Sequence, residues 1–438
     1  MNTQEIFDLA KKKGIEDLQL YISTSKSIGL SLYESEIDSY EVNSNREITA
    51  KGIYNGKMVT VSSEKDDKNL AKYIVDSIIK NARIITSKDE VSIYEGSKEY
   101  GKVNTFNEEL ENISMEDKIN KLFEMDKKVR AKDPTLKDVA SIFYNETSSS
   151  LEIINSKGLH LNSKKNSYQC GLEVIKELNG NSEAGFYYTV DNDYSKLDVD
   201  RIIDKALEDV NSRMGGKPCK TGYYDIVLAS ETTTNLLNVI LSGLTYENIS
   251  KNLSFLKGKL GTKVFGDNIT IVEDPLMSDS LASASFDSEG VATKFKTLVE
   301  NGVVKTFVYN LKNAKKANVE PTGNAVGSGE GFFNAILKGE DNSKEDLYNK
   351  VNNGLYISEL DGLHSGLDPI SGQFSLKAGG RIISNGKLEG PVKLITIAGN
   401  VYNMFNNVLA LGNDFEEVKH SRVKAPSVIF KNISVSGL

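Results

Sequence analysis

The chain has 438 residues, 39% of them apolar, and its 53 Lys and Arg against 61 Asp and Glu give a formal net charge of −8 at pH 7. This length predicts two or three domains with sizeable cores. The acidic balance argues against a nucleic-acid-binding protein, which would need a basic surface to contact phosphates. No apolar run reaches the ~20 residues that span a bilayer. Two cysteines, Cys170 and Cys219, are too few for a disulfide framework or a four-sulfur zinc site.

A short amphipathic helix is predicted at the amino terminus, with Ile6, Leu9 and Ala10 on one face and Gly14 at its end. The segment carries acidic residues and lacks the continuous apolar stretch of a secretory signal. We therefore expect a cytoplasmic protein.

The segment that follows shows a weak internal duplication, in which alternating strands are followed by a helix. Ser114 with Asp117 forms a capping-box signal at the start of the helix that joins the two units. Several separate strands are expected in each unit, for example LQLYISTS followed by GLSLYESEID. The pattern predicts two strand meanders flanked by helices, forming one or two antiparallel sheets. The strands are expected within residues 18–62 and 139–190, and the helices near 67–85, 114–132 and 197–213.

A turn-rich break at 215–218 precedes a half dominated by strands. Helices are expected near 231–244 and 343–352, and Asn-Gly pairs at 55–56, 301–302 and 385–386 indicate hairpins. The fold class is therefore α+β, with largely antiparallel sheets and flanking helices in a two-part architecture. The expected division is an α/β unit at 1–105, a linker helix with a second meander at 106–218 that shares a domain with the first unit, and a β-rich domain at 219–438.

Histidine placement argues against a zinc site. The chain has only three histidines, His160, His364 and His420, and the two that are nearest in sequence lie 56 residues apart. Zinc enzymes commonly use two His one helical turn apart together with a third ligand. No EF-hand-like spacing is present either. We interpret His160 as a strand residue and His420 as part of a solvated, charged stretch, and we predict no metal ligands and no catalytic residues in this chain.

The loop GLHSGLDPISG contains His364 with Ser365 and Asp368 close by. Sequence neighbours rarely form a catalytic triad, so we interpret His364 as an ordinary loop histidine. The glycine-rich AVGSGEGFF lacks the Lys-Ser or Lys-Thr of a phosphate loop and is interpreted as a surface loop.

A tight turn is predicted at Ser285, Phe286, Glu289 and Gly290, where small polar residues lead into a hairpin. A free strand edge at this turn could pair with an extended peptide. We regard this turn and the His364, Ser365 and Asp368 loop as candidate substrate-binding walls.

Several long motifs resemble the TldD/PmbA family, also called modulator of DNA gyrase. The family's central signature resembles the segment FDSEGVATKFKTLVENGVVKTFVYNLKNAKK of this chain, which is followed by PTGNA. The family's carboxyl-terminal signature resembles three further segments of this chain, GLYISELDG, DPISGQFSLKAGGRIISNGKLEGPVKLITIAGN and MFNNVLALGND. REITAKGIYNGKMVTVSSEK resembles the opening domain. The resemblance covers essentially the whole chain. It implies a cytoplasmic protein involved in proteolysis and peptide maturation.

Within this family the resemblance points to the PmbA (TldE) branch. TldD-type members carry a His-Glu-x-x-x-His helix and a later Cys that bind the metal. The corresponding helix here, NLLNVILSGLTYENISK near 235–251, has neither His nor Cys, and no Cys lies near 411–413. The resemblance therefore implies a metal-free subunit without a cofactor of its own, which shapes a peptide-holding chamber with a zinc-bearing TldD-type partner in a heterodimer, or forms a homodimer. No direct contact with nucleic acid or membrane is expected. The alternatives are an autonomous peptidase with an unrecognised site and a non-enzymatic, protein-binding modulator.

Overall fold

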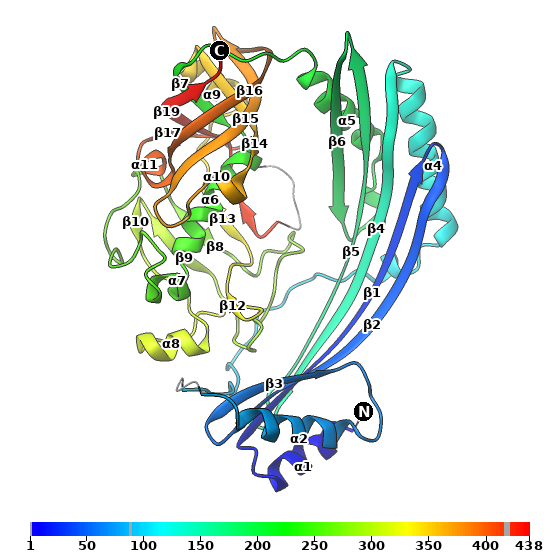
Figure 1. Cartoon of the computed structure of the whole chain (residues 1–438), viewed down its shortest axis with the longest axis vertical. Helices are drawn as coiled ribbons and strands as arrows, with labels where there is room; N and C mark the ends of the chain where they lie inside the picture. Colours follow the sequence, from blue (N-terminus) through cyan, green and yellow to red (C-terminus); the bar gives the residue numbers. More distant parts are fainter. Residues whose placement is uncertain (1, 87–89, 416–420) are drawn as a thin grey trace.

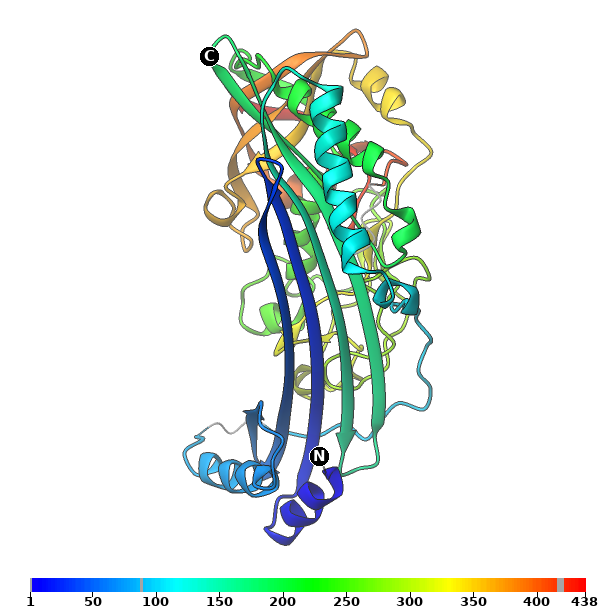
Figure 2. The same cartoon turned by 90° about the vertical axis from the view of Figure 1, so that its right-hand side faces the viewer.

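Six strands form one antiparallel sheet in the amino-terminal half, in the order β3-β2-β1-β4-β5-β6. The computed structural model describes residues 2–86, 90–415 and 421–438. Figures 1 and 2 show the four long strands β1, β2, β4 and β5 running side by side along the length of the molecule. The strands of this sheet are β1 (Asp17–Tyr33), β2 (Glu36–Tyr54), β3 (Lys57–Ser63), β4 (Leu136–Asn155), β5 (His160–Leu178) and β6 (Asn181–Asp191).

The predicted number of strands in this half was wrong. We expected LQLYISTS and GLSLYESEID to be separate strands, but β1 continues without a break through Ser23–Ser27. Serine and threonine continue a strand when their hydroxyls pair across it, and the hydroxyl oxygens of Thr24 and Ser150 lie 2.6 Å apart. The turn comes instead at Glu34 and Ser35, both of which have positive φ. Two long hairpins therefore replace the predicted short strands.

This sheet has an apolar core at each end. At one end α1 (Thr3–Lys12) and α2 (Leu70–Ala82) pack on the sheet, and at the other α4 (Met115–Lys132) and α5 (Val199–Arg213) do so. Between the two cores, β1 passes through Ser23–Ser27. Polar residues fill this middle stretch, so the two ends are separate hydrophobic clusters bridged by backbone pairing. Two short elements complete this half, α3 (Glu108–Glu111) and the 3-10 helix η1 (Tyr194–Lys196).

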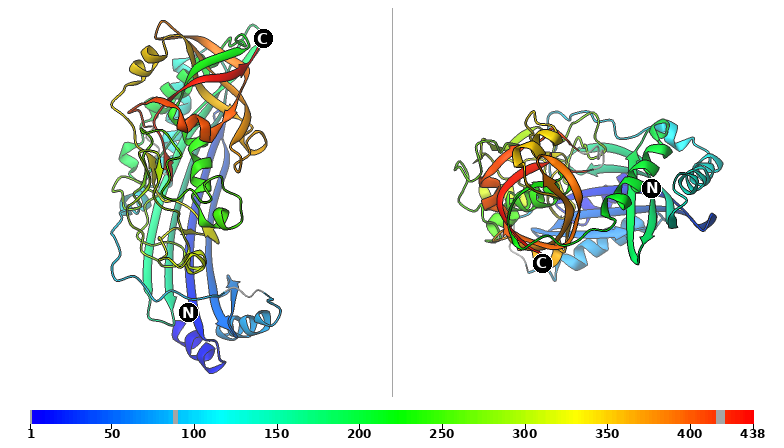
Figure 3. Two further views of the ribbon diagram at one scale, coloured as in Figure 1. Left: turned by 90° about the vertical axis from the view of Figure 1, so that its left-hand side faces the viewer. Right: turned by 90° about the horizontal axis from the view of Figure 1, so that it is seen from above.

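The carboxyl-terminal half contains a second six-stranded sheet, in the order β16-β15-β14-β7-β19-β17. An additional pairing between β16 and β19 curves this sheet into a ring, which Figure 3 shows from above. The buried side chains of α6 (Ser230–Gly243) belong to the same cluster as the inward-facing side chains of these strands. The strands are β7 (Gly222–Leu228), β14 (Gly354–Asp361), β15 (Gln373–Ser384), β16 (Lys387–Asn400), β17 (Val408–Leu411) and β19 (Val428–Ser436).

A smaller sheet with the order β10-β9-β8-β13-β18 lies beside this ring, together with the short hairpin β11–β12. Its strands are β8 (Ile271–Glu273), β9 (Lys296–Glu300), β10 (Val303–Val304), β13 (Ala335–Leu337) and β18 (Val423–Lys424), and the hairpin joins β11 (Ala325–Val326) to β12 (Gly329–Glu330). The remaining helices are α7 (Tyr246–Ser250), α8 (Leu311–Ala317), α9 (Lys344–Val351), α10 (Leu363–Gly366) and α11 (Val401–Asn406).

The predicted fold class is confirmed: the protein is α+β, and its sheets are mostly antiparallel with flanking helices. The helix predicted near 343–352 is α9, and a capping box of Ser343 and Asp346 forms at its start. The Asn-Gly pairs at 55–56, 301–302 and 385–386 form the turns between β2 and β3, β9 and β10, and β15 and β16, and all six residues have the positive φ that such turns require. Among the helices that the structure describes, none is long and apolar enough to cross a membrane.

Candidate functional site at the junction of the two halves

The predicted turn at 285–290 docks on the amino-terminal sheet. Phe286 is buried in one cluster with Ile153 and Leu159, and its ring meets the edge of Tyr100 with the centroids 6.3 Å apart. The Tyr100 hydroxyl also donates to the backbone oxygen of Gly290 at 2.8 Å. Apolar contact and a hydrogen bond therefore join this turn to the other half of the molecule.

Asp287 shapes this turn from within. One carboxylate oxygen accepts the backbone N–H groups of Glu289 and Val291, at 2.9 and 3.0 Å, and the other accepts that of Ala325 at 2.9 Å. Burial raises the pKa of this carboxyl, and the three N–H groups act in the opposite direction. Ser285 closes the base of the turn, where its backbone oxygen accepts the N–H of Thr293 at 3.1 Å.

Glu289 is half-buried beside Asp287. Its carboxylate accepts the backbone N–H of Leu311, the first residue of α8, at 2.8 Å. Burial raises the pKa of Glu289 to about 7, and the charge of Asp287 acts in the same direction, whereas the N–H of Leu311 and the charge of Lys51 on β2 oppose the rise. The group is therefore a carboxyl that changes protonation near neutral pH, at the contact between the two halves.

The second predicted loop lies elsewhere, and no hydrogen bond or ion pair among the described residues joins it to the 285–290 turn. His364 and Ser365 are exposed on the short helix α10, and the Ser365 hydroxyl donates to the backbone oxygen of Gly362 at 3.3 Å. Asp368 accepts from Ser371 and the backbone of Ile370, and the Ser371 hydroxyl lowers its pKa. These contacts close a local turn. The substrate-binding role of both segments stays a prediction.

His160 and the two cysteines take no part in either segment. His160 is exposed at the start of β5, with its Nε2 2.7 Å from a carboxylate oxygen of Glu152. His420 lies outside the residues that the structure describes. Cys170 is buried, and its burial raises the pKa of the thiol to about 12, while Cys219 is half-buried. A thiol with so high a pKa is a poor nucleophile at neutral pH.

An open cavity of about 380 Å³ lies where α6 and α7 meet the β11–β12 hairpin and β18. The helices contribute Asn238, Ser242, Thr245 and Asn248, and Arg422 lines another side. The segment that was predicted as one helix near 235–251 is instead divided into the end of α6 and α7, with Thr245 between them, and it faces a cavity lined by amide and hydroxyl groups.

The two carboxylates in the lining of this cavity are already bound. Glu330 accepts from the backbone of Asn310 at 3.0 Å, from the Asn313 amide at 2.8 Å and from the backbone of Glu247 at 2.9 Å. Glu247 itself pairs with Lys251 at 2.6 Å. Across residues 2–86, 90–415 and 421–438, no group of three or more His, Cys, Asp or Glu side chains is arranged to hold a metal ion. The donors that face the cavity do not fit zinc, which takes His, Cys and free carboxylates.

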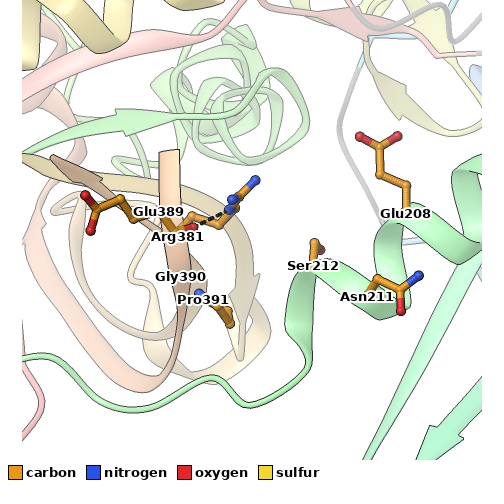
Figure 4. Close-up of a pocket in the computed structure, with 7 residues that line it drawn as sticks. All are labelled: Glu208, Asn211, Ser212, Arg381, Glu389, Gly390 and Pro391. Carbon is orange, nitrogen blue, oxygen red and sulfur yellow. Dashed lines mark hydrogen bonds between the residues drawn. The ribbon is translucent and has the colours of Figure 1, made fainter. Parts of the chain in front are cut away.

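A second open cavity, of about 440 Å³, lies at the seam between the halves (Figure 4). Glu208, Asn211 and Ser212 on α5 face the β15–β16 hairpin, where Arg381 Nε donates to the backbone oxygen of Glu389 at 2.8 Å. Close by, two ion pairs cross the seam: Lys393 with Glu183, and Arg213 with Glu359 at 3.1 Å. This region joins the halves and contains no arrangement suited to acid–base or nucleophilic chemistry.

Sequence reasoning missed Arg422 and Glu330, which line the 380 Å³ cavity, and Lys165, whose Nζ donates to the backbone oxygen of Ser283 at 2.9 Å. The glycine-rich surface loop around Glu330 was recognised, but its carboxylate was given no role. Arg422 and Lys165 lie in ordinary charged stretches, so no local signal distinguishes them.

Comparisons with known proteins define the class. The PmbA/TldA metallopeptidase central domain matches residues 108–213, and the C-terminal domain of that family matches residues 221–437. The chain belongs to the PmbA/TldD family, as its motifs predicted.

Individual relatives agree with this assignment. A metalloprotease PmbA homolog from Buchnera aphidicola subsp. Acyrthosiphon pisum is 29% identical over 65% of this chain, and the match covers 66% of that relative, just under two thirds of its length. A crystal structure of a putative modulator of a DNA gyrase from Thermotoga maritima is 29% identical, with a TM-score of 0.91 and 99% of each chain covered. TldE from Thermococcus kodakarensis, at 24% identity, has the same fold, with a TM-score of 0.89 over 99% of this chain and 100% of that one.

Proposed function

We propose that this protein is the metal-free, PmbA/TldE-like subunit of a two-component metallopeptidase. The observation that carries the proposal is the lining of the cavity at α6 and α7. TldD-type members are expected to carry His and Glu in this segment, but here the segment presents Asn238, Ser242, Thr245 and Asn248. Amide and hydroxyl groups bind peptide backbone well and zinc poorly.

In this proposal the partner subunit supplies the zinc, and this chain forms part of the wall of the chamber that holds the peptide. A TldD-type subunit pairs with this chain in the cytoplasm, and together they enclose an unfolded peptide during proteolysis or peptide maturation. The peptide is held in part by strand addition, because an extended chain gains main-chain hydrogen bonds at a strand edge. The partner's zinc would supply the hydrolytic chemistry, and residues of this chain hold the peptide.

Mixing the purified chain with a TldD-type protein tests the proposal. We expect the two to co-elute on size-exclusion chromatography, metal analysis to find zinc in the TldD-type chain alone, and the mixture to cleave unstructured peptides faster than either chain. Failure to co-elute together with unchanged cleavage would overturn it.

The lone chain tests the alternative of an autonomous peptidase. We expect no peptide cleavage by the lone chain. Cleavage that His364→Ala abolishes, but that the control His160→Ala leaves intact, would instead identify an autonomous site at His364. Both histidines are exposed, so neither variant should impair folding.

A further inference from the structure

One edge of the amino-terminal sheet is open. β3 pairs with β2 from Ile48 to Tyr54, and among the residues that the structure describes no strand pairs with the outer side of β2 over Glu36–Glu47, which we call the open edge. Figure 2 shows β1 and β2 at one margin of the sheet, beside the strands over which α4 lies. An open strand edge presents backbone N–H and C=O groups to which another extended chain can bond.

The open edge also carries an uncovered apolar face. Residues directly opposite each other in paired strands point to the same side of a sheet. Three apolar residues of the open edge lie opposite three apolar residues of β1: Ile37, Tyr40 and Val42 face Leu32, Leu30 and Ile28. The β1 residues pack in the core formed with α4 and α5, whereas the three on β2 are 48%, 56% and 60% exposed. Apolar side chains gathered at the uncovered margin of a core indicate a binding surface, unlike apolar side chains scattered singly.

The charges of the open edge select the kind of partner. Its carboxylates outnumber its cations by four to one: Glu36, Asp38, Glu41 and Glu47 against Arg46. Arg46 is also paired with Asp66 of the same chain at 2.8 Å. Two copies of the open edge would each bring an excess of carboxylates to the contact, whereas a basic segment would bring opposite charges together. The open edge therefore fits a basic strand better than a second copy of this chain.

We propose that the open edge of β2 binds a basic, extended segment of a peptide as an added strand. Main-chain hydrogen bonds hold the segment, and its apolar side chains cover Tyr40 and Val42. Because side chains alternate along a strand, its Lys or Arg side chains face Glu41 and Glu47 on the other side. The open edge lies far from the cavity beside α6 and α7 (Figure 1), so it anchors a part of a long peptide that lies outside that cavity.

The inference rests on the proposed peptide-holding function and names its substrate class, peptides with a basic segment in which charged and apolar residues alternate. Four labelled peptides of one length test it. The first alternates Lys with Val or Tyr, and the second has Glu in place of every Lys. The third has the composition of the first with its Lys residues gathered at one end. The fourth is the first peptide with its backbone N–H groups methylated.

Fluorescence anisotropy with the full chain measures the four affinities at low salt. We expect the first peptide to bind about tenfold more tightly than each of the others, because it alone combines opposite charge, alternation and free N–H groups. Added salt should narrow its advantage over the second peptide, since salt screens exposed charges.

Variants of the open edge test where the peptide binds. Tyr40→Ser combined with Val42→Ser removes the apolar face, and Glu41→Lys reverses one charge. Each change should weaken binding of the first peptide by at least about threefold. The matched controls, Leu394→Ser and Glu99→Lys, alter exposed residues outside β2 and should leave the affinity unchanged. Thermal unfolding shows that each variant is folded, and the comparison of the four peptides on wild type needs no variant.

Equal affinity for the first two peptides, binding that survives methylation, or full affinity in the Tyr40→Ser and Val42→Ser variant would overturn the inference. Analytical ultracentrifugation of the lone chain tests the other occupant: a dimer that Val42→Arg converts to a monomer would assign the open edge to a second copy and also overturn it. The two proposals fail separately. Peptide discrimination without co-elution would retain the open-edge site and reject the partnership, whereas co-elution without discrimination would do the reverse.

Discussion

Two regions of the molecule differ in the partners that they provide for a lysine that is at least partly buried. Lys296 on β9 pairs with the fully buried Glu273 on β8 at 2.8 Å, and the side chains are 9% and 0% exposed. Glu273 also accepts from the Asn324 amide and the backbone N–H of Phe333. At the junction of the two halves, the half-buried Lys165 bonds, among the residues that the structure describes, to the backbone oxygen of Ser283 alone. The described part of the chain thus provides a carboxylate for the lysine in the first region and a neutral carbonyl oxygen for the lysine in the second.

This difference distinguishes buried charges that are required for the stability of the fold from charges that are not. A buried ion pair whose remaining lone pairs are bound is part of the structure, and removing one partner leaves the other unpaired. Lys118 repeats the arrangement in the amino-terminal half, where it pairs with Glu146 at 2.8 Å and the Tyr144 hydroxyl donates to the same carboxylate. A half-buried cation with a carbonyl partner in place of a carboxylate contributes less to folding than a buried ion pair does.

The largest expected effect is that of Glu273→Ala. It leaves the ammonium of Lys296 buried without a counter-ion and also removes the acceptor for Asn324 and Phe333. We expect it to lower the free energy of unfolding by ~3–5 kcal/mol. Urea unfolding followed by circular dichroism measures this loss. A loss below about 1 kcal/mol would show that this region does not depend on its ion pair.

The next effect concerns Glu289, a half-buried carboxyl near the charge of Lys51. Its pKa is about 7 in the folded protein against an ordinary value of 4.5, so the folded state holds this proton more tightly than the unfolded state. The resulting stabilisation is complete below pH 4.5 and is lost as the pH rises through 7, by up to ~3 kcal/mol. Urea unfolding at pH 5 and pH 8 should show a larger decline in wild type than in Glu289→Gln. Equal declines would contradict the prediction.

Lys165→Met should change the free energy of unfolding by less than ~1 kcal/mol, because the lost hydrogen bond to Ser283 is offset by relief of an unpaired, desolvated cation. The same urea titration compares it with Glu273→Ala. A loss as large as that of Glu273→Ala would remove the distinction between the two regions and assign Lys165 to the fold.

The smallest effect should come from an exposed pair. Lys377 and Asp361 lie 2.9 Å apart on β15 and β14, with side chains 62% and 60% exposed. Because water screens such a pair, Asp361→Ala should cost less than ~1 kcal/mol. It is the matched control for Glu273→Ala, since each variant removes one carboxylate from one lysine.

Local signals in the sequence were sufficient for several elements. Ser114 and Ser343 begin helices as predicted, because a cap depends only on residues three positions away. The Asn-Gly turns formed for the same reason. The long strands were not recognised, because a polar middle segment such as Ser23–Ser27 resembles a loop until its neighbours on both sides are known.

The candidate site also combines features that the local sequence predicted with features that depend on the tertiary structure. The turn at Phe286 and Glu289 was identified from its small and polar residues, but its contact with Tyr100 and the pKa of Glu289 depend on the other half of the molecule. The environment of Lys165 depends on the nearness of Arg422, 257 positions later in the chain, which no sequence period encodes.

The sequence by itself determined the α+β class, the helix caps, the hairpin turns, the family and the lack of paired histidines, because each depends on residue type, short spacing or a contiguous motif. Only the tertiary structure decided that β7 lies between β14 and β19, that β16 pairs with β19 to form a ring, and that Lys165 and Arg422 share a corner. These features arise when residues far apart in the chain are buried together, and burial also sets the pKa values and the charges left without a partner.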